Sequence, residues 1–179
     1  MNKEHESGKY VVFVGFLGVL LGSTILFLPL LRTFLSGEVV SVYTYALINF
    51  FSYLFFTSTF IELLFIQLVR LGGNPVVFTL VAVSTALLAL SVDYLIGYAF
   101  SRSFLTRFVS EKKIIKYQSR IEKYGDPVIF VFNVFPLASP LLTLVAGILR
   151  YNKRRIFFYS FLGLSIKYSS IAIFLTFFV

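Results

Sequence analysis

A proline-broken apolar stretch from Pro127 to Leu149 limits what this chain can fold into. The stretch is apolar enough to enter a bilayer, yet its centre holds Asn133, Pro136, Ser139 and Pro140. Prolines remove backbone donors and break helices. Each arm beside the break is then about 14 Å of helix, which reaches only the midplane of a hydrocarbon core about 30 Å thick. We therefore predict a re-entrant hairpin, with a proline-kinked spanning helix as the alternative.

The charges on both flanks of this stretch support the hairpin. Seven cations precede it and four follow it. They are Arg102, Arg107, Lys112, Lys113, Lys116, Arg120 and Lys123 before it, and Arg150, Lys153, Arg154 and Arg155 after it. Cationic loops stay on the cytoplasmic side of a membrane. Both flanks are thus predicted to be cytoplasmic, and Arg150, Arg154 and Arg155 are expected to face lipid headgroups.

The overall composition is that of an integral membrane protein. Of 179 residues, 58% are hydrophobic and only 13% are charged, whereas soluble proteins have about 25% charged residues. We predict a polar tail over residues 1–9 and one membrane domain over 10–179. The net charge of +8 lies beside apolar segments, so the expected partners are anionic lipid headgroups rather than nucleic acid.

Residue types needed for several chemistries are absent from the sequence. It has no cysteine, which excludes disulfides, thiol catalysis and cysteine metal sites. The single histidine, His5, lies in the polar tail. We therefore expect no enzyme activity, no metal and no cofactor.

Three segments are predicted to cross the membrane. The first, Tyr10–Leu31, is too long for the apolar part of a signal peptide and no small-residue cleavage site follows it, so we expect a retained span with a cytoplasmic N-terminus. The others are Val76–Phe100, which contains Asp93, and Ile156–Val179, which contains Lys167. The protein is then a multi-pass protein of the cell membrane.

The apolar segment Val39–Val69 is long for one span and short for two, since each span needs about 20 residues. Its centre is polar, with Thr57, Ser58 and Thr59 followed by Glu62. We predict a second re-entrant hairpin with residues 57–59 at its tip or just beyond it. One long span remains the alternative.

Residues 101–124 interleave apolar side chains with the seven cations that precede the proline-broken stretch. This pattern is typical of a basic amphipathic helix on the cytoplasmic surface, and an ordinary solvated connector is the alternative. The complete prediction is an all-α membrane protein with three transmembrane helices, two re-entrant helical hairpins entering from opposite faces, and this surface helix. Transporters with inverted repeats place their sites between broken helices in this way.

Three charged residues fall well inside apolar segments: Glu62, Asp93 and Lys167. A charge at mid-bilayer costs at least about 2.5–3.5 kcal/mol, so these side chains should face the protein interior and pair. We expect Glu62 to pair with Lys167, with Asp93 as the competing acid. Two acids and one base leave one spare charge or one proton, which suits a proton-coupled step. A salt bridge that only holds helices together is the alternative.

The predicted substrate and proton path combines these charges with the polar and proline residues of the broken stretch. Its members are Glu62, Asp93, Lys167, Asn133, Pro136, Ser139 and Pro140.

Five motifs in order carry a family resemblance. They are Gly72-Gly73-Asn74-Pro75 about ten residues after Glu62, Asp93-Tyr94-Leu95-Ile96-Gly97, Glu122-Lys123-Tyr124-Gly125, Phe135-Pro136 through Ala146-Gly147 with Arg150-Tyr151-Asn152, and Gly163-Leu164-Ser165-Ile166-Lys167-Tyr168. In their order and spacing, the chain resembles the DedA family, also called the VTT or SNARE-associated Golgi-protein-like family, and especially its YqaA-like branch.

The resemblance implies two facing re-entrant hairpins and movement of lipid between leaflets, as a flippase or scramblase of phospholipid or polyprenyl phosphate. It places Glu62 at the acid of the first hairpin. Many members carry arginines beside the second-hairpin proline, where this chain has Asn133 and Ser139. Headgroups would then be held by Lys167 or by backbone donors. A small ion- or proton-coupled solute transporter and a structural subunit of a membrane complex are the alternatives, and a homo-oligomer is left open.

Overall fold

The computed structural model describes residues 40–54, 58–99, 110–135, 137 and 139–178. The predicted first span, Tyr10–Leu31, lies outside the described residues, as do residues 101–109 and Pro136. The described part is helical and contains no strand. Its seven helices are α2 (Val42–Leu54), α3 (Ser58–Arg70), α4 (Pro75–Ala99), α6 (Glu111–Tyr124), α7 (Asp126–Val134), α8 (Ser139–Ile148) and α9 (Lys153–Phe178).

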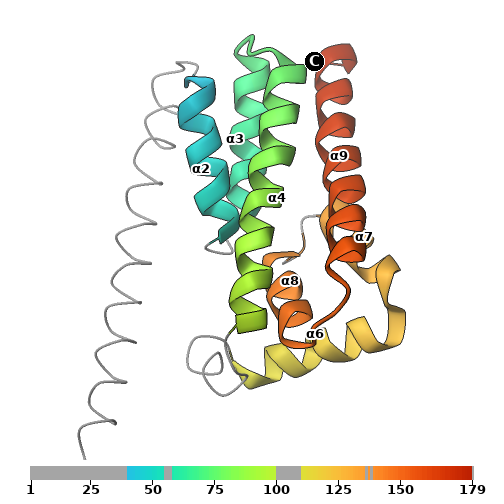
Figure 1. Cartoon of the computed structure of the whole chain (residues 1–179). Helices are drawn as coiled ribbons and strands as arrows, with labels where there is room; N and C mark the ends of the chain where they lie inside the picture. The colour runs from blue at the N-terminus through green and yellow to red at the C-terminus, as the bar shows by residue number, and fades with distance from the viewer. Residues whose placement is uncertain (1–39, 55–57, 100–109, 136, 138, 179) are drawn as a thin grey trace, which may run out of the picture.

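The two long helices α4 and α9 lie side by side and run in opposite directions (Figure 1). Within the described residues they are the two helices long and apolar enough to cross a membrane. At 1.5 Å per residue they are about 37 and 39 Å long, against about 30 Å for a hydrocarbon core. Asn74 caps α4 by accepting hydrogen bonds from the backbone N–H groups of Val76 and Val77, and Pro75 begins the helix. Two glycines followed by Asn-Pro predict a turn with proline at the head of the next helix, and the structure has both at this site.

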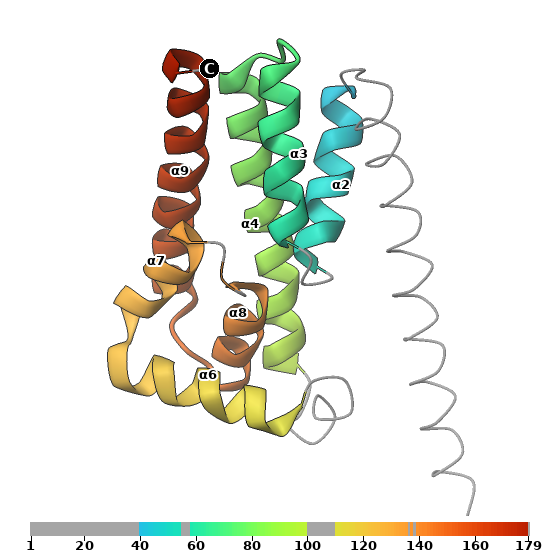
Figure 2. The same cartoon turned by 180° about the vertical axis from the view of Figure 1, so that it is seen from behind.

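Two helical hairpins pack against different halves of this long pair. α2 and α3 form one hairpin at the end where α4 begins and α9 ends, and α7 and α8 form the other at the opposite end (Figures 1 and 2). The tips of the two hairpins point toward each other, and the connection at residues 55–57 lies outside the described residues. Each predicted hairpin segment therefore forms two helices, not one continuous or kinked helix.

The break in the second hairpin differs in one respect from the prediction. α7 ends at Val134, and Phe135 is extended, with φ −92° and ψ 157°. Pro140, which we expected to break the helix, instead lies in the first turn of α8. The missing N–H of proline costs no hydrogen bond there, because first-turn N–H groups have no partner within the helix. Pro140 thus begins a helix, and the two helices are separate, since α7 ends at Val134 and α8 begins at Ser139.

Glycines bring the hairpin helices into backbone contact with the long ones. A Cβ atom on Gly97 of α4 would collide with the carbonyl oxygen of Leu144 in α8, and one on Gly147 would collide with the carbonyl oxygen of Tyr94. A Cβ atom on Gly163 of α9 would lie 2.7 Å from the Cβ atom of Asn133 in α7. Small residues allow this close approach where apolar burial alone gives little driving force in a membrane. Both arms of the second hairpin are fixed in this way.

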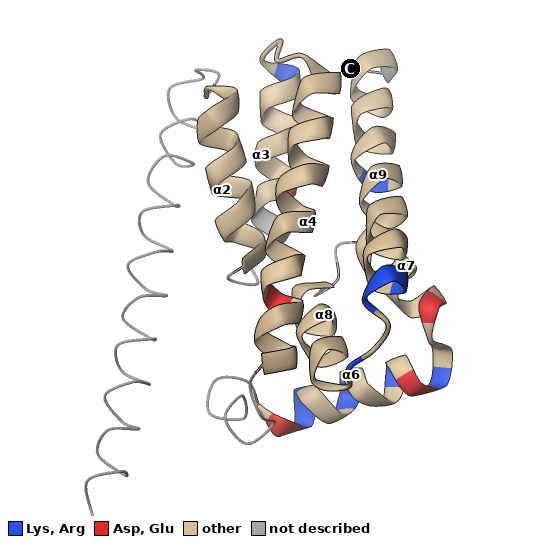
Figure 3. Ribbon diagram, in the orientation of Figure 1, with Lys and Arg blue, Asp and Glu red and all other residues tan. Residues whose placement is uncertain are grey.

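Helix α6 lies across the end of the bundle beneath α7 and α8 (Figure 1). Its apolar residues Ile114 and Ile121 are buried in the core that those helices form. The Tyr117 and Phe132 rings pack edge to face, with their centres 5.7 Å apart. We expected α6 to rest its apolar face on the membrane surface. Ile114 and Ile121 face the protein core, whereas Ile115 is exposed, so the surface position of residues 101–124 stays a prediction. The cations of α6 and of the start of α9 gather at this end (Figure 3).

Candidate functional site: a buried ion pair between the hairpins

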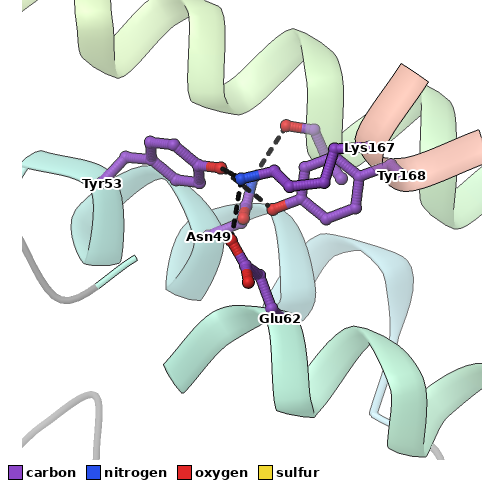
Figure 4. Close-up of polar contacts among 6 residues, drawn as sticks. Asn49, Tyr53, Glu62, Lys167 and Tyr168 are labelled. Carbon is purple, nitrogen blue, oxygen red and sulfur yellow. Dashed lines mark hydrogen bonds and ion pairs between the residues drawn. The ribbon is translucent and has the colours of Figure 1, made fainter. Parts of the chain in front are cut away.

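The expected pairing of Glu62 with Lys167 is present in the core. The Lys167 ammonium donates to Glu62 Oε1 at 2.7 Å. The Glu62 side chain is 13% exposed and the Lys167 side chain is 6% exposed. Glu62 comes from α3 in the first hairpin, and Lys167 from the middle of α9 (Figure 4). The pair therefore joins the first hairpin to a long helix.

Two phenols complete the surroundings of the lysine. The Lys167 ammonium also donates to the Tyr53 hydroxyl at 3.2 Å, and that hydroxyl lies 3.3 Å from the Tyr168 hydroxyl (Figure 4). The ammonium lies 5.7 and 5.5 Å from the centres of the Tyr53 and Tyr168 rings. Ring faces stabilise a desolvated cation. The sequence contains 11 tyrosines, so nothing in it singled out these two.

Asn49 of α2 connects the same hairpin to α4. Its amide donates to the Ala82 carbonyl at 2.9 Å and to Thr85 Oγ1 at 2.6 Å. Its own Oδ1 is buried and has no hydrogen-bond partner among the described residues, and the same holds for the Tyr45 hydroxyl one turn away. Asn49 was not predicted as a site residue because, unlike Asn133, it has no helix-breaking proline near it in the sequence.

The predicted site residue Asn133 occupies the corresponding place in the second hairpin. Its amide donates to the Ile129 carbonyl at 2.8 Å and to Ser160 Oγ of α9 at 3.2 Å, while its buried Oδ1 has no partner in the described part of the chain. Ser160 precedes Lys167 by seven residues, which is about 10 Å along α9. One helix therefore carries the polar contacts of both hairpins, two turns apart.

Two further predicted residues of the second hairpin, Ser139 and Pro140, are buried at the start of α8. The Ser139 carbonyl accepts a hydrogen bond from Thr143 Oγ1 within the same helix. Ser139 and Pro140 thus lie in the core close to the tip of the second hairpin.

Asp93, the competing acid for Lys167, has no partner among the described residues. It is 1% exposed, and no hydrogen bond or ion pair joins its carboxylate to another described residue. It lies eight residues beyond Thr85 on α4, about 12 Å along the helix, and one turn before Gly97, which touches α8. It is the spare acid that remains once Glu62 pairs with Lys167.

The three arginines predicted to face headgroups lie at the α6 end, and all are exposed. Arg155 is bonded to Asp126 at the start of α7, with its Nη1 3.3 Å from Oδ2. The Arg150 guanidinium lies 5.3 Å from the centre of the Tyr98 ring. These contacts tie the start of α9 to α7, and the loop before α9 to the end of α4.

Tyr151 adds a second bond to the same acid. Its hydroxyl donates to Asp126 Oδ1 at 2.7 Å, and the Tyr94 hydroxyl donates to its carbonyl at 2.9 Å. Burial, with the hydrogen bond to Asp126, raises the pKa of the Tyr151 hydroxyl. The hydroxyl therefore stays protonated and donates this hydrogen bond over the physiological pH range. The start of α7 thus stays bonded to the loop between α8 and α9 over the same range.

Within the described residues, no group of three acidic, histidine or cysteine side chains is placed to hold a metal ion.

The comparison with protein families places these features in one domain. The family model described as the VTT domain matches residues 42–177, from the first residue of α2 to the last turn of α9. The chain belongs to the VTT-domain family. The resemblance to the DedA/VTT family is thereby confirmed, while the YqaA-like branch stays a prediction. No curated protein and no solved structure matches the chain. The VTT domain and its two long apolar helices identify a membrane protein.

Proposed function

We propose that this VTT-domain protein is a lipid transporter, a flippase or scramblase that passes a lipid headgroup between the leaflets along the polar residues between its two hairpins. The observation that carries the proposal is the Glu62–Lys167 ion pair, buried where the first hairpin meets α9. Charge inside a membrane domain is costly and by default marks a substrate or ion pathway.

The lengths of the helices support re-entrant hairpins. α7 and α8 have 9 and 10 residues and α2 and α3 have 13 each, so they extend about 14, 15 and 20 Å. None of the four crosses a core about 30 Å thick. The two hairpins then enter from opposite faces, and broken helices of this kind stay in a membrane because protein surrounds their tips.

The distribution of charge sets the orientation we propose. In the described chain, the α6 end carries Lys112, Lys113, Lys116, Arg120, Lys123, Arg150, Lys153, Arg154 and Arg155, and the opposite end carries Arg70. By the positive-inside rule the α6 end is cytoplasmic. Its exposed cations would gather anionic headgroups beside the second hairpin.

The polar groups between the hairpins form successive steps for such a headgroup. Asn133 with Ser160 is nearest the cytoplasmic end, and Glu62 with Lys167 follows two helical turns along α9. Each step contains a buried polar atom or charge that a headgroup could bind. Lys167 is the cation that would pair with a phosphate, which requires its bond to Glu62 to open.

One observation favours a second candidate, a proton-coupled transporter of a small solute. Asp93 is a buried acid without a partner among the described residues, and such an acid could take up and release a proton. We do not propose an enzyme, because the whole sequence has no cysteine and its one histidine is in the polar tail. Homo-oligomerisation, and a structural role in a larger complex, stay predictions.

A liposome assay separates the two transport classes. Purified protein is reconstituted with a short-chain lipid that carries a fluorescent nitrobenzoxadiazole group, and dithionite then bleaches only the outer leaflet. We expect the protein to expose the inner-leaflet fluorophore to bleaching, with no leak of a trapped soluble dye. Protein that leaves the inner leaflet protected, while driving solute uptake under a proton gradient, would overturn the lipid assignment in favour of the second candidate.

A further inference from the structure

An open groove runs between the beginning of α4 and the end of α9, away from the polar core. Its volume is about 450 Å³ and its lining is almost entirely apolar. Pro75, Thr79, Ser169 and Ala172 are the buried or half-buried residues of the lining, and the others, among them Leu80, Ile173 and Phe177, are exposed along its rims. Small residues between large ones leave a slot along the surface of the two long helices.

We infer that this groove binds one acyl chain of a membrane phospholipid. Both walls are helices that we place across the bilayer, so the groove opens sideways onto hydrocarbon. No residue of its lining carries a charge. The lining offers little polar surface to a headgroup. Thr176 Oγ1 is bonded to the Ala172 carbonyl at 2.8 Å, and Thr79 Oγ1, which has no partner among the described residues, is buried and does not reach the groove.

The length of the groove matches an acyl chain of one leaflet. From Phe177 at the end of α9 to Ser169 is eight residues, about 12 Å of helix. Half of a hydrocarbon core is about 15 Å. The groove therefore begins near the membrane surface and ends near the midplane, two residues from Lys167. Residues two apart on a helix point to nearly opposite sides, so a chain in the groove would lie on the side of α9 away from the ion pair.

The inference concerns binding, and it depends on α4 and α9 crossing the bilayer, not on lipid transport. Its test uses a phosphatidylcholine with a photoreactive diazirine on one acyl chain, in phosphatidylcholine liposomes that contain the full-length protein. After illumination, mass spectrometry of peptides locates the crosslinks. We expect them to concentrate on residues 75–80 and 169–177.

Two filling variants and a matched control make the test specific. Ser169→Leu and Thr176→Leu add bulk in the groove at its two ends, and both should lose the crosslinks. Ser170→Leu adds the same bulk on the neighbouring exposed residue of α9, outside the groove, and should keep them. Crosslinks spread equally over exposed residues such as Leu88 and Leu95, or unchanged by both filling variants, would overturn the inference. So would efficient disulfide formation between two copies of Thr176→Cys that excludes the lipid, because the groove would then be a dimer interface.

Discussion

Replacing Lys167 by methionine removes the positive half of the buried pair and keeps a long, unbranched side chain. Glu62 is then left with 13% of its side chain exposed and no cation among its described contacts. The change also removes the hydrogen bond from the ammonium to the Tyr53 hydroxyl. Lys167→Met should therefore destabilise the protein far more than the loss of an ordinary surface charge.

The magnitude follows from the burial of both partners. Removing one member of a buried ion pair costs about 3–5 kcal/mol, because the other charge stays buried and unpaired. Because Glu62 keeps some exposure, we expect the lower end, about 3 kcal/mol. A second change, Glu62→Gln, removes the stranded charge and keeps the side-chain shape. The double variant should recover about 2 kcal/mol of the lost unfolding free energy. This coupling energy lies within the range that double-mutant cycles give for residues in contact.

The assay is unfolding in mixed micelles with increasing sodium dodecyl sulfate, followed by far-ultraviolet circular dichroism. Lys153→Met is the matched control, since it makes the same change on the same helix at an exposed position and should alter the unfolding free energy by less than about 0.5 kcal/mol. Equal losses in Lys167→Met and Lys153→Met would refute the reasoning. So would additive losses in the double variant, which would show that the two side chains are not coupled.

Three further predictions address the packing, the unpaired acid and the orientation. Gly97→Ala should lower the unfolding free energy by about 1–3 kcal/mol through overpacking against α8, while Ser84→Ala on the exposed face of α4 should change it little; equal effects would contradict the contact. Asp93→Asn should leave the unfolding free energy unchanged or raise it by up to about 1 kcal/mol, because it removes a buried charge without a described partner. A decrease in the unfolding free energy of more than about 1 kcal/mol would show that the Asp93 carboxylate has a partner. In sealed vesicles an impermeant maleimide should label Lys116→Cys and Arg154→Cys from the same side and Arg70→Cys from the other, since the parent has no cysteine; opposite labelling of the first two would exclude the re-entrant second hairpin.

The sequence predicted the helical breaks well, because breaks depend on local chemistry. The Gly72 to Pro75 turn, the interruption before Pro140 and the polar centre near Ser58 follow from the backbone preferences of those residues. The assignment of Pro140 to the break itself was wrong, since a proline at a helix start and one at a helix end look alike in sequence. Only the following residues, Leu141 to Ile148, show that a helix begins there.

Side-chain partners were harder to predict, because they depend on how helices rotate about their axes. Glu62 and Lys167 could be paired from the cost of burying either one alone. The same count left one acid spare but could not say from the sequence which one, and in the structure it is Asp93, which is buried. Tyr53, Tyr168 and Asn49 carry no charge, so no energetic argument from sequence distinguished them from neighbouring residues. The burial of α6 against α7 and α8 also needed the tertiary structure, since an amphipathic helix fits a protein core as well as a membrane surface.

The most direct test of the central claim measures lipid inversion by the Glu62→Gln, Lys167→Met double variant in liposomes. This variant removes both buried charges together, so its fold should be retained, and circular dichroism and the yield of reconstituted protein verify that. If the ion pair lies on the path of the headgroup, wild type and Ser84→Ala, a change on the exposed face of α4, should expose the inner-leaflet fluorophore to dithionite at equal rates, and the double variant should fall to the rate of protein-free liposomes. A folded double variant that inverts lipid as fast as wild type would contradict the account.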